Sequence, residues 1–274
     1  MDDQHEKIKA MVKETFDAVS GGYDGSSLRF FPRSAENMAE LLGLKGDEQV
    51  LDVACGTGHA SLAVARKLPK GQVTAVDFST GMLGQARSKA ESLGIGNIRF
   101  AEGDMQDLPF PAGSFDAAIC SFGIFFVMDM ETQLAHIASR VKPGGRVMIS
   151  NFKEDYFHPL KDRFLGRLSA YGVQQPPQAW KRIAHTAGCR QLFAAAGLTG
   201  IRTEQRNVGY HLAGADEWWD IVWNAGYRRL VAQLPADKQE QFRREHLEEV
   251  DALKGKDGIW LDVGVLYTVG ENPV

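Results

Sequence analysis

The amino-acid sequence predicts an α/β protein built around a doubly wound sheet. From Gln49 onward, short apolar segments alternate with segments of helical periodicity. The apolar segments are almost uninterrupted, which is typical of parallel strands buried on both faces. A glycine-rich turn follows the first of them and leads into a helical segment. Because strand–helix–strand crossovers are right-handed, this alternation favours a parallel sheet with helices on both faces.

The expected elements of the first half follow in chain order. An amphipathic helix covers residues 1–20 and ends at Gly21-Gly22, and a second helix covers about 34–42. Five strands and three intervening helices are expected next, the strands at 49–54, 72–77, 97–101, 115–121 and 145–150, the helices near 59–68, 80–93 and 130–141. The segment VKPGGR at 141–146 indicates a helix stop and a turn into the fifth strand.

The alternation of strand and helix breaks after residue 150. The sequence then favours, in order, a helix at 155–172, a turn at 175–177, a helix at 186–196, a strand at about 200–211, a long helical segment at 214–253 and a last strand at 259–269. We therefore expect seven strands in one sheet, with helical additions at the front, after the fifth strand and before the last strand.

Composition limits the possible function classes. The chain has 274 residues, of which 44% are hydrophobic and 24% charged, as expected for one soluble α/β domain with a modest appendage. A net charge of −4 offers no positive field, so we expect no nucleic-acid partner. Three scattered cysteines suit neither a disulfide framework nor a zinc site, and no two histidines lie four residues apart, so we expect no metal.

The sequence also bears on localisation. The charged N-terminus lacks the apolar core of a signal peptide, and no uncharged run approaches the roughly 18 residues that a membrane span requires. We expect a cytoplasmic protein with a small-molecule partner and no membrane span. Monomer and homodimer both stay open.

The glycine-rich turn is the sharpest functional signal. The strand at 49–54 contains Asp52 and passes through Gly56, Thr57 and Gly58 into a helix. Glycine allows a ligand to lie against the backbone at the carboxyl edge of a sheet, where a β-carbon would intrude. An acid in this first turn would repel a pyrophosphate but suits an amine or a sulfonium. S-adenosylmethionine (SAM) carries both groups.

Asp77 is the expected partner of this turn. It ends the second strand, 19 residues after Gly58, where a carboxylate can accept both hydroxyls of a ribose. NAD-dependent dehydrogenases share this feature, so it indicates a nucleoside without naming the cofactor. Ser61 stands where the dinucleotide fingerprint has its third glycine, and together with Asp52 it disfavours NAD.

Two further segments follow strands at the same expected edge. Asp104 and Met105 come after the third strand, where an acid can accept from an adenine amino group and Met105 can lie against the ring. Taken alone, Asp104 would be better explained as a loop acid. Ser121 and Phe122 come at the end of the fourth strand, where the reactive part of a ligand would lie.

These residues together resemble the class I SAM-dependent methyltransferases, most closely the ubiquinone/menaquinone-biosynthesis C-methyltransferase family. Five motifs carry the resemblance over about residues 14–150: DVACGTG, AVDFSTGML, DLPFPAGSFD, SFGIFFVMD and RVKPGGR. It implies a Rossmann-like fold whose seven-stranded sheet is mostly parallel with an antiparallel last strand. It also implies a helical lid, which we expect at 1–45. We expect the methyltransferase domain at 46–274, with helical insertions at about 154–185 and 214–256.

The resemblance implies SAM as the cofactor and a set of contacts to it. The implied cofactor-binding residues are Asp52, Gly56, Thr57, Gly58, Asp77, Phe78, Met82, Asp104, Met105 and Ser121, with Tyr23 as a lid residue.

Two departures from that family affect the acceptor. Phe125 and Phe126 stand where the quinone-directed members carry an Arg-Asn pair, and the aromatic-rich segment 214–253 is an addition. We expect Phe122, Phe125, Phe126 and Trp218 to line an acceptor pocket, although helical spacing also suits a core role for at least two of Trp218, Trp219, Trp223 and Tyr227.

A general base is not evident from the sequence. His158 and His185 fall in the segment that would cover the acceptor and are weak candidates, each better explained by a surface or capping role. His59 is better explained as a helix-start residue near the cofactor, and His211 is no better placed.

The sequence thus predicts a SAM-dependent methyltransferase that acts on carbon or oxygen of a small, apolar or aromatic acceptor. Two alternatives remain: an NAD-dependent oxidoreductase, and a SAM-binding protein without catalytic activity. Tight nicotinamide-cofactor binding would distinguish the first, and SAM binding without turnover the second.

Overall fold

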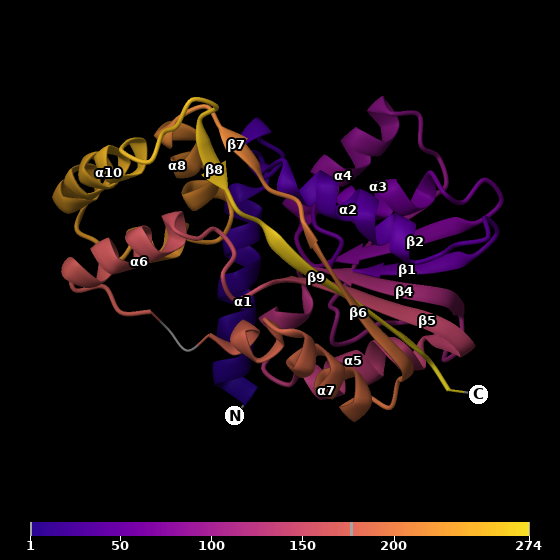
Figure 1. Cartoon of the computed structure of the whole chain (residues 1–274). Coiled ribbons are helices and arrows are strands. Elements are labelled where there is room, and N and C mark those ends of the chain that lie inside the picture. Colours follow the sequence, from indigo (N-terminus) through magenta and orange to yellow (C-terminus); the bar gives the residue numbers. More distant parts are fainter. Residues whose placement is uncertain (1, 176–177, 274) are drawn as a thin grey trace.

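A seven-stranded sheet forms the centre of the larger part of the molecule (Figure 1). The computed structural model describes residues 2–175 and 178–273. In spatial order the strands are β3 (Ile98–Glu102), β2 (Gln72–Asp77), β1 (Gln49–Val53), β4 (Phe115–Ser121), β5 (Val141–Phe152), β9 (Gly264–Glu271) and β6 (Thr199–Asn207). Strands β1 to β5 pair in parallel, and β9 is antiparallel to both of its neighbours. The predicted fold class is confirmed.

Helices cover both faces of this sheet. On one side lie α2 (Phe30–Leu41), α3 (His59–Ala65) and α4 (Thr80–Ser92), and on the other α5 (Met130–Ser139) and α7 (Thr186–Ala195) (Figure 1). Side chains of β1 alternate between the two layers, since Val50 joins one hydrophobic core while Leu51 and Val53 join the other. Burial on both faces explains why the strand sequences are almost continuously apolar.

The first helices begin and end close to the expected bounds. Helix α1 covers Asp2–Val19 and is followed by the short helix η1 (Ser26–Leu28). Helix α2 starts four residues earlier than expected, because Pro32 falls in its first turn, where a missing N–H costs nothing. In the part of the chain that the structure describes, no helix is both long and apolar enough to cross a membrane.

Three expected boundaries need correction. The strands expected at 200–211 and 259–269 each divide in two, and the extra pieces β7 (Tyr210–Leu212) and β8 (Ile259–Leu261) pair as a separate ribbon. The turn expected at 141–146 lies inside β5, where the pairing with β4 shifts register. Of the turn expected at 175–177, Pro176 and Pro177 lie outside the described residues.

The long helical segment expected at 214–253 consists of three helices. These are α8 (Ala215–Asn224), α9 (Arg228–Val231) and α10 (Ala236–Asp251). Gly226, with φ of 96°, breaks the segment after α8, and Pro235 precedes α10. Both residues favour an interruption of the helix over a continuous helix.

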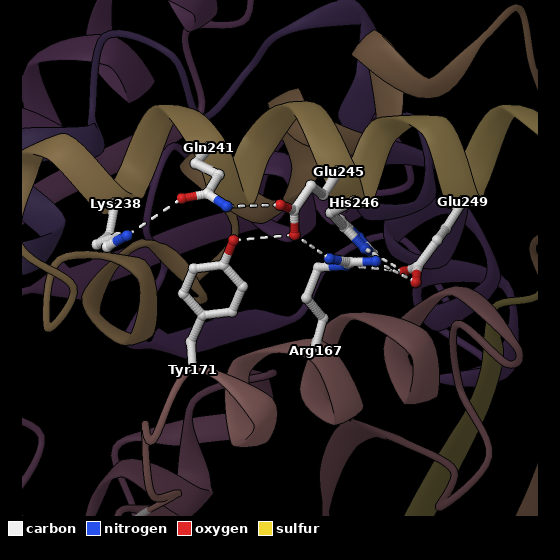
Figure 2. A network of polar contacts seen from close by, with 7 residues as sticks. All are labelled: Arg167, Tyr171, Lys238, Gln241, Glu245, His246 and Glu249. Carbon is white, nitrogen blue, oxygen red and sulfur yellow. Dashed lines mark hydrogen bonds and ion pairs between the residues drawn. The ribbon is translucent and has the colours of Figure 1, made fainter.

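Helix α6 (Leu160–Ala170) packs beside α10 through a polar network (Figure 2). Arg167 reaches from α6 to both Glu245 and Glu249 on α10, and the Tyr171 hydroxyl donates to Glu245 at 2.9 Å. On the buried side of α10, the Trp218 indole N–H of α8 donates to His246 at 2.8 Å. These contacts join α6, α8 and α10 into one helical cluster beside the sheet.

Candidate active site

A cavity of about 380 Å³ opens where β1, β2 and β4 end. The order of strands reverses between β1 and β4, and ligands of open α/β sheets bind in the crevice outside the carboxyl ends at such a point. Helix α1 contributes Val12, Phe16 and Val19 to its wall. The volume lies within the usual range for small-molecule sites.

The cavity wall divides into two parts by chemistry. The polar half follows the strand ends and includes Gly56, Thr57, Asp77, Phe78, Met82, Asp104, Met105 and Ser121. The aromatic half includes Phe31, Phe122, Phe125, Phe126, Phe152, Tyr156, Trp180 and Tyr227. All eight of these residues of the polar half were predicted from the sequence as cofactor contacts, whereas only Phe122, Phe125 and Phe126 of the aromatic half were assigned to the acceptor pocket.

The two turn glycines have different reasons to be glycine. Gly56 has φ of 54°, and a β-carbon built there would meet no protein atom within 4 Å, so this backbone is open to the cavity. At Gly58, with φ of 82°, a β-carbon would lie 3.0 Å from the β-carbon of Ala86. Gly58 does not line the cavity, so its expected place against a ligand is corrected to close packing on α4.

Asp77 connects the second strand to the glycine-rich turn. Its Oδ2 accepts from the Gly56 N–H at 2.8 Å and its Oδ1 from the Ser79 N–H at 2.9 Å. Burial raises the pKa of Asp77, while these N–H donors oppose the rise. Each carboxylate oxygen keeps a lone pair for a further donor, so the side chain can still accept from ligand hydroxyls.

Asp52 lies away from the cavity, contrary to the sequence analysis. It is fully buried, and its Oδ2 accepts from the Ser61 hydroxyl of α3 at 2.5 Å. Within the described residues its Oδ1 has no hydrogen-bond partner. Burial raises the pKa of Asp52 to about 7. The carboxyl expected to face a cation from the first turn is therefore enclosed between strand and helix.

Helix α1 is attached to the polar half by carboxylates at two points. Lys9 of α1 forms an ion pair with Asp104 Oδ2, while Asp104 Oδ1 accepts from the Gln106 N–H at 2.9 Å. Near the end of α1, Asp17 accepts from the Ser79 hydroxyl and from the Gly81 N–H. The acid expected to meet an adenine thus already has a partner from α1.

The segment after α1 is held to the glycine-rich turn by Asp24. Its carboxylate accepts from the Thr57 hydroxyl at 2.6 Å, from His59 Nε2 at 2.8 Å and from Lys89 Nζ at 2.7 Å. Burial opposes ionisation, but the hydrogen bonds from these three groups lower the pKa of Asp24 to about 2. Tyr23 lines the cavity and stacks on Phe31 at 4.8 Å between ring centroids.

The aromatic half is a chain of touching rings. The Phe122 ring contacts Phe31 at 5.5 Å and Phe152 at 4.4 Å, Phe152 stacks on Tyr156 at 4.5 Å, and Tyr156 meets Trp180 edge-on at 5.3 Å. Phe122 has a positive φ of 53°, which turns the chain sharply at the end of β4. Phe126, in the short helix η2 (Ile124–Phe126), meets Phe16 of α1.

The structure moves Trp218 out of the expected acceptor pocket. Trp218 is fully buried in the helical cluster against Phe157 and Phe164 and does not line the cavity. Tyr227, from the same expected segment, lines the cavity instead. Among the residues not foreseen, Phe152 ends β5 and Tyr156 follows it at the same sheet edge, and this position is the one signal that could have indicated them.

The two weak base candidates do not reach the cavity. The His158 side chain is 66% exposed and pairs with Asp162, and His185 is exposed at the start of α7. His211 is exposed too, with its ring against Trp260. His59 lines the cavity, where its Nε2 is held by Asp24. Across residues 2–175 and 178–273, no group of three His, Cys, Asp or Glu side chains could hold a metal ion.

Comparison with known proteins identifies the chemistry. A family model described as "Methyltransferase domain" matches residues 50–145. The ubiquinone/menaquinone biosynthesis C-methyltransferase of Cronobacter sakazakii is 32% identical over 193 residues, which are 67% of this chain and 74% of that protein. The nocamycin O-methyltransferase of Saccharothrix syringae is 24% identical over 271 residues, 93% of this chain and 96% of that one.

A solved structure shares the fold. The phosphoethanolamine N-methyltransferase 2 of Haemonchus contortus, in complex with SAM, matches with a TM-score of 0.53 and 16% identity, covering 88% of this chain and 53% of that one. The predicted cofactor and enzyme class are confirmed, and the alternatives of an oxidoreductase and of a non-catalytic protein are set aside. The chain belongs to the class I SAM-dependent methyltransferases, close to the C-methyltransferases of ubiquinone and menaquinone biosynthesis.

Proposed function

We propose that the polar half of the cavity binds SAM and that the aromatic half binds a small, planar, largely apolar acceptor, which is methylated at carbon or oxygen. The observation that carries this proposal is the continuity of the two halves within one cavity. An acceptor held by the rings would lie beside a cofactor held by the strand ends. The relatives named above, a C-methyltransferase and an O-methyltransferase, support either atom as the methyl acceptor.

The residues of the polar half fit the cofactor. Gly56 leaves open backbone where a ligand can lie, and Asp77 offers lone pairs to the ribose hydroxyls. Met82, Phe78 and Met105 give apolar surface for the adenine. Thr57, Asp104 and Ser121 complete the proposed contacts, while Asp52 and Gly58 act through the protein itself.

Bound SAM supplies a methyl group already activated by its sulfonium, so the chain has mainly to align the acceptor and exclude water. Alignment of this kind can contribute about 7–11 kcal/mol. The ring chain from Phe31 to Trp180 fixes the plane of an acceptor, and the apolar wall keeps the developing neutral products in a dry site. With SAM held by Gly56 and Asp77, in-line attack would form the bond between the acceptor atom and the methyl carbon, break the sulfur–methyl bond and release S-adenosylhomocysteine.

We propose that α1 and the segment to residue 45 act as the lid of this site. The proposal rests on the contacts of Lys9, Asp17 and Asp24 with the polar half and of Phe16 with Phe126. An ordered lid lies between solvent and both halves of the cavity, and it must open for the acceptor to enter.

A pair of substitutions separates the two halves. Asp77→Ala should weaken SAM binding about tenfold or more, because a buried acceptor of hydrogen bonds is lost. Phe125→Arg should reduce turnover strongly while SAM affinity changes less than threefold, since it places a charge in the aromatic half. Calorimetry gives the affinities, and release of S-adenosylhomocysteine with a panel of phenols and enolisable aromatic ketones gives the turnover. Equal loss of affinity and turnover in Phe125→Arg would contradict the division into halves.

A further inference from the structure

Two phenol groups meet in the aromatic half. The hydroxyls of Tyr156 and Tyr227 lie 2.7 Å apart, and both residues line the cavity. Tyr156 follows β5, while Tyr227 lies between α8 and α9, so the two come from segments 71 residues apart. Among residues 2–175 and 178–273, each of these two hydroxyls forms a hydrogen bond only with the other.

The pair carries one hydroxyl proton more than its mutual hydrogen bond uses. Two neutral hydroxyls carry two protons, and only one lies in the bond between them. Burial raises the pKa of Tyr156 to about 12, against the effect of its bond to Tyr227, and burial also raises the pKa of Tyr227 well above its usual value. Both phenols therefore stay protonated at neutral pH, and the second proton is available to a ligand atom.

The pair is held in place before any ligand arrives. The Tyr156 ring stacks on Phe152 at an interplanar angle of 15° and lies 3.9 Å from the ammonium of Lys161. Lys161 is almost fully buried and donates to the Glu154 carbonyl at 2.7 Å, which fixes its position. The Tyr227 ring packs on Phe164 of α6 at 5.4 Å. A donor fixed in this way needs little reorganisation to bind an acceptor atom.

We infer that the Tyr156–Tyr227 pair is a hydrogen-bond donor site for an oxygen atom on the methyl acceptor, and that it selects aromatic molecules bearing a carbonyl or phenolate oxygen. This inference rests on the proposed function of the aromatic half. An acceptor with such an oxygen satisfies the spare O–H, whereas a purely hydrocarbon ring leaves a buried donor unpaired. Sites built to hydrogen-bond a substrate reject the analogue that lacks the group.

The same bond would assist the reaction without moving a proton. A hydrogen bond from the pair stabilises negative charge on the acceptor oxygen, so it lowers the pKa of the acceptor and favours the enolate or phenolate, whose proton passes to solvent water; this anion then attacks the methyl carbon. Among the described residues, no histidine stands in the aromatic half to remove a proton. The two tyrosines are accordingly positioning and specificity residues.

Two probes that differ by one oxygen test the inference. 1-Tetralone and tetralin share a fused-ring skeleton, and only the ketone carries a hydrogen-bond acceptor. In calorimetric titrations with and without S-adenosylhomocysteine, the wild-type protein should bind 1-tetralone about tenfold or more tightly than tetralin. The double variant Tyr156→Phe with Tyr227→Phe, which removes both hydroxyl protons, should bring this ratio close to one while leaving tetralin affinity within about twofold.

Tyr171→Phe is the matched control. Its hydroxyl bonds to Glu245 in the helical cluster and does not line the cavity, so the preference for the ketone should persist. Infrared spectra of carbonyl-labelled 1-tetralone provide a readout that a structural role would not change. The carbonyl stretch of the bound ketone should shift to lower frequency in the wild type and in Tyr171→Phe, and this shift should disappear in the double variant.

The contrary outcomes are distinct from a failure of the proposed function. Equal affinity of the wild type for the two probes, binding of neither, or an unchanged preference in the double variant would overturn the donor site. Failure of the proposed function would instead appear as absence of SAM binding or of methyl transfer. The probe preference does not depend on either, because it is measured without the cofactor as well.

Discussion

Two carboxylates on neighbouring strands illustrate how environment assigns a role. Asp77 ends β2 and holds the Gly56 N–H, so it shapes the turn while lining the cavity. Asp52 lies one residue before the end of β1 and is enclosed against Ser61. Strand side chains alternate between faces, so Asp52 points to the α3 layer while Leu51 and Val53 lie on the opposite face. The same residue type thus lines the cavity at one position and is enclosed in the protein interior at the other.

The protonation of Asp52 leads to a prediction about stability. Its pKa is about 7 in the folded chain and 3.8 as an ordinary aspartate, so between these values the folded state holds a proton that the unfolded state has lost. The free energy of unfolding therefore falls as the pH rises through this window. Between pH 5 and pH 8, ionisation of Asp52 should lower the free energy of unfolding by about 2–3 kcal/mol.

Asp52→Asn tests this prediction, because the amide cannot ionise. Urea unfolding at pH 5 and pH 8 should show a smaller loss of stability in the variant than in the wild type. Asp47→Asn, which removes the same charge from an exposed position, should behave like the wild type. A loss in Asp52→Asn equal to that of the wild type would show that Asp52 does not hold a proton in the folded state.

At the scale of elements, α1 and the segment after it are attached to the site mainly by polar groups. Lys9 and Asp17 connect α1 to the polar half, and Asp24 connects the next segment to Thr57, His59 and Lys89. Ion pairs at the surface contribute little individually, so the proposed lid, held in this way, can open at modest cost. An acceptor could then enter without disturbing the sheet.

Asp24→Asn should loosen this attachment. The amide loses the charge that pairs with His59 and Lys89, so amide hydrogens of residues 10–24 should exchange several-fold faster, while those of β1 and β4 stay unchanged. Glu36→Gln, which breaks an exposed pair with Arg66, serves as the control and should leave exchange in α1 unchanged. If Asp24→Asn exchanges like the wild type, other contacts hold the segment in place.

The sequence predicted the elements that are defined locally, and with them the polar half of the site. Strand, turn and helix at 49–65 follow from apolar pattern and glycine, and Asp77 follows from its place at a strand end. The choice between Trp218 and Tyr227 could not be predicted, because Gly226 interrupts the expected helix and turns Tyr227 toward the cavity side. Hydrophobic periodicity predicts the type of a secondary-structure element, but it does not predict which other element its apolar face packs against.

The aromatic half shows the same limit at the scale of the whole molecule. Phe31, Phe152 and Trp180 come from three segments that only the completed fold brings together. The helical cluster behind them carries its own polar network between α6 and α10, and it supports Tyr227 through Phe164. The carboxyl ends of the strands therefore supply the polar half of the cavity, and the region of the helical cluster contributes Tyr227 to the aromatic half.

Calorimetric titration with SAM, S-adenosylhomocysteine and NAD tests the central claim most directly, with Gly56→Ala and Gly144→Ala beside the wild type. Both glycines have positive φ and open space for a β-carbon, but only Gly56 lines the cavity. We predict one SAM per chain, weakened about tenfold or more in Gly56→Ala, unchanged in Gly144→Ala, and no binding of NAD. Equal SAM affinity in all three proteins, or binding of NAD in place of SAM, would contradict a SAM site in the polar half.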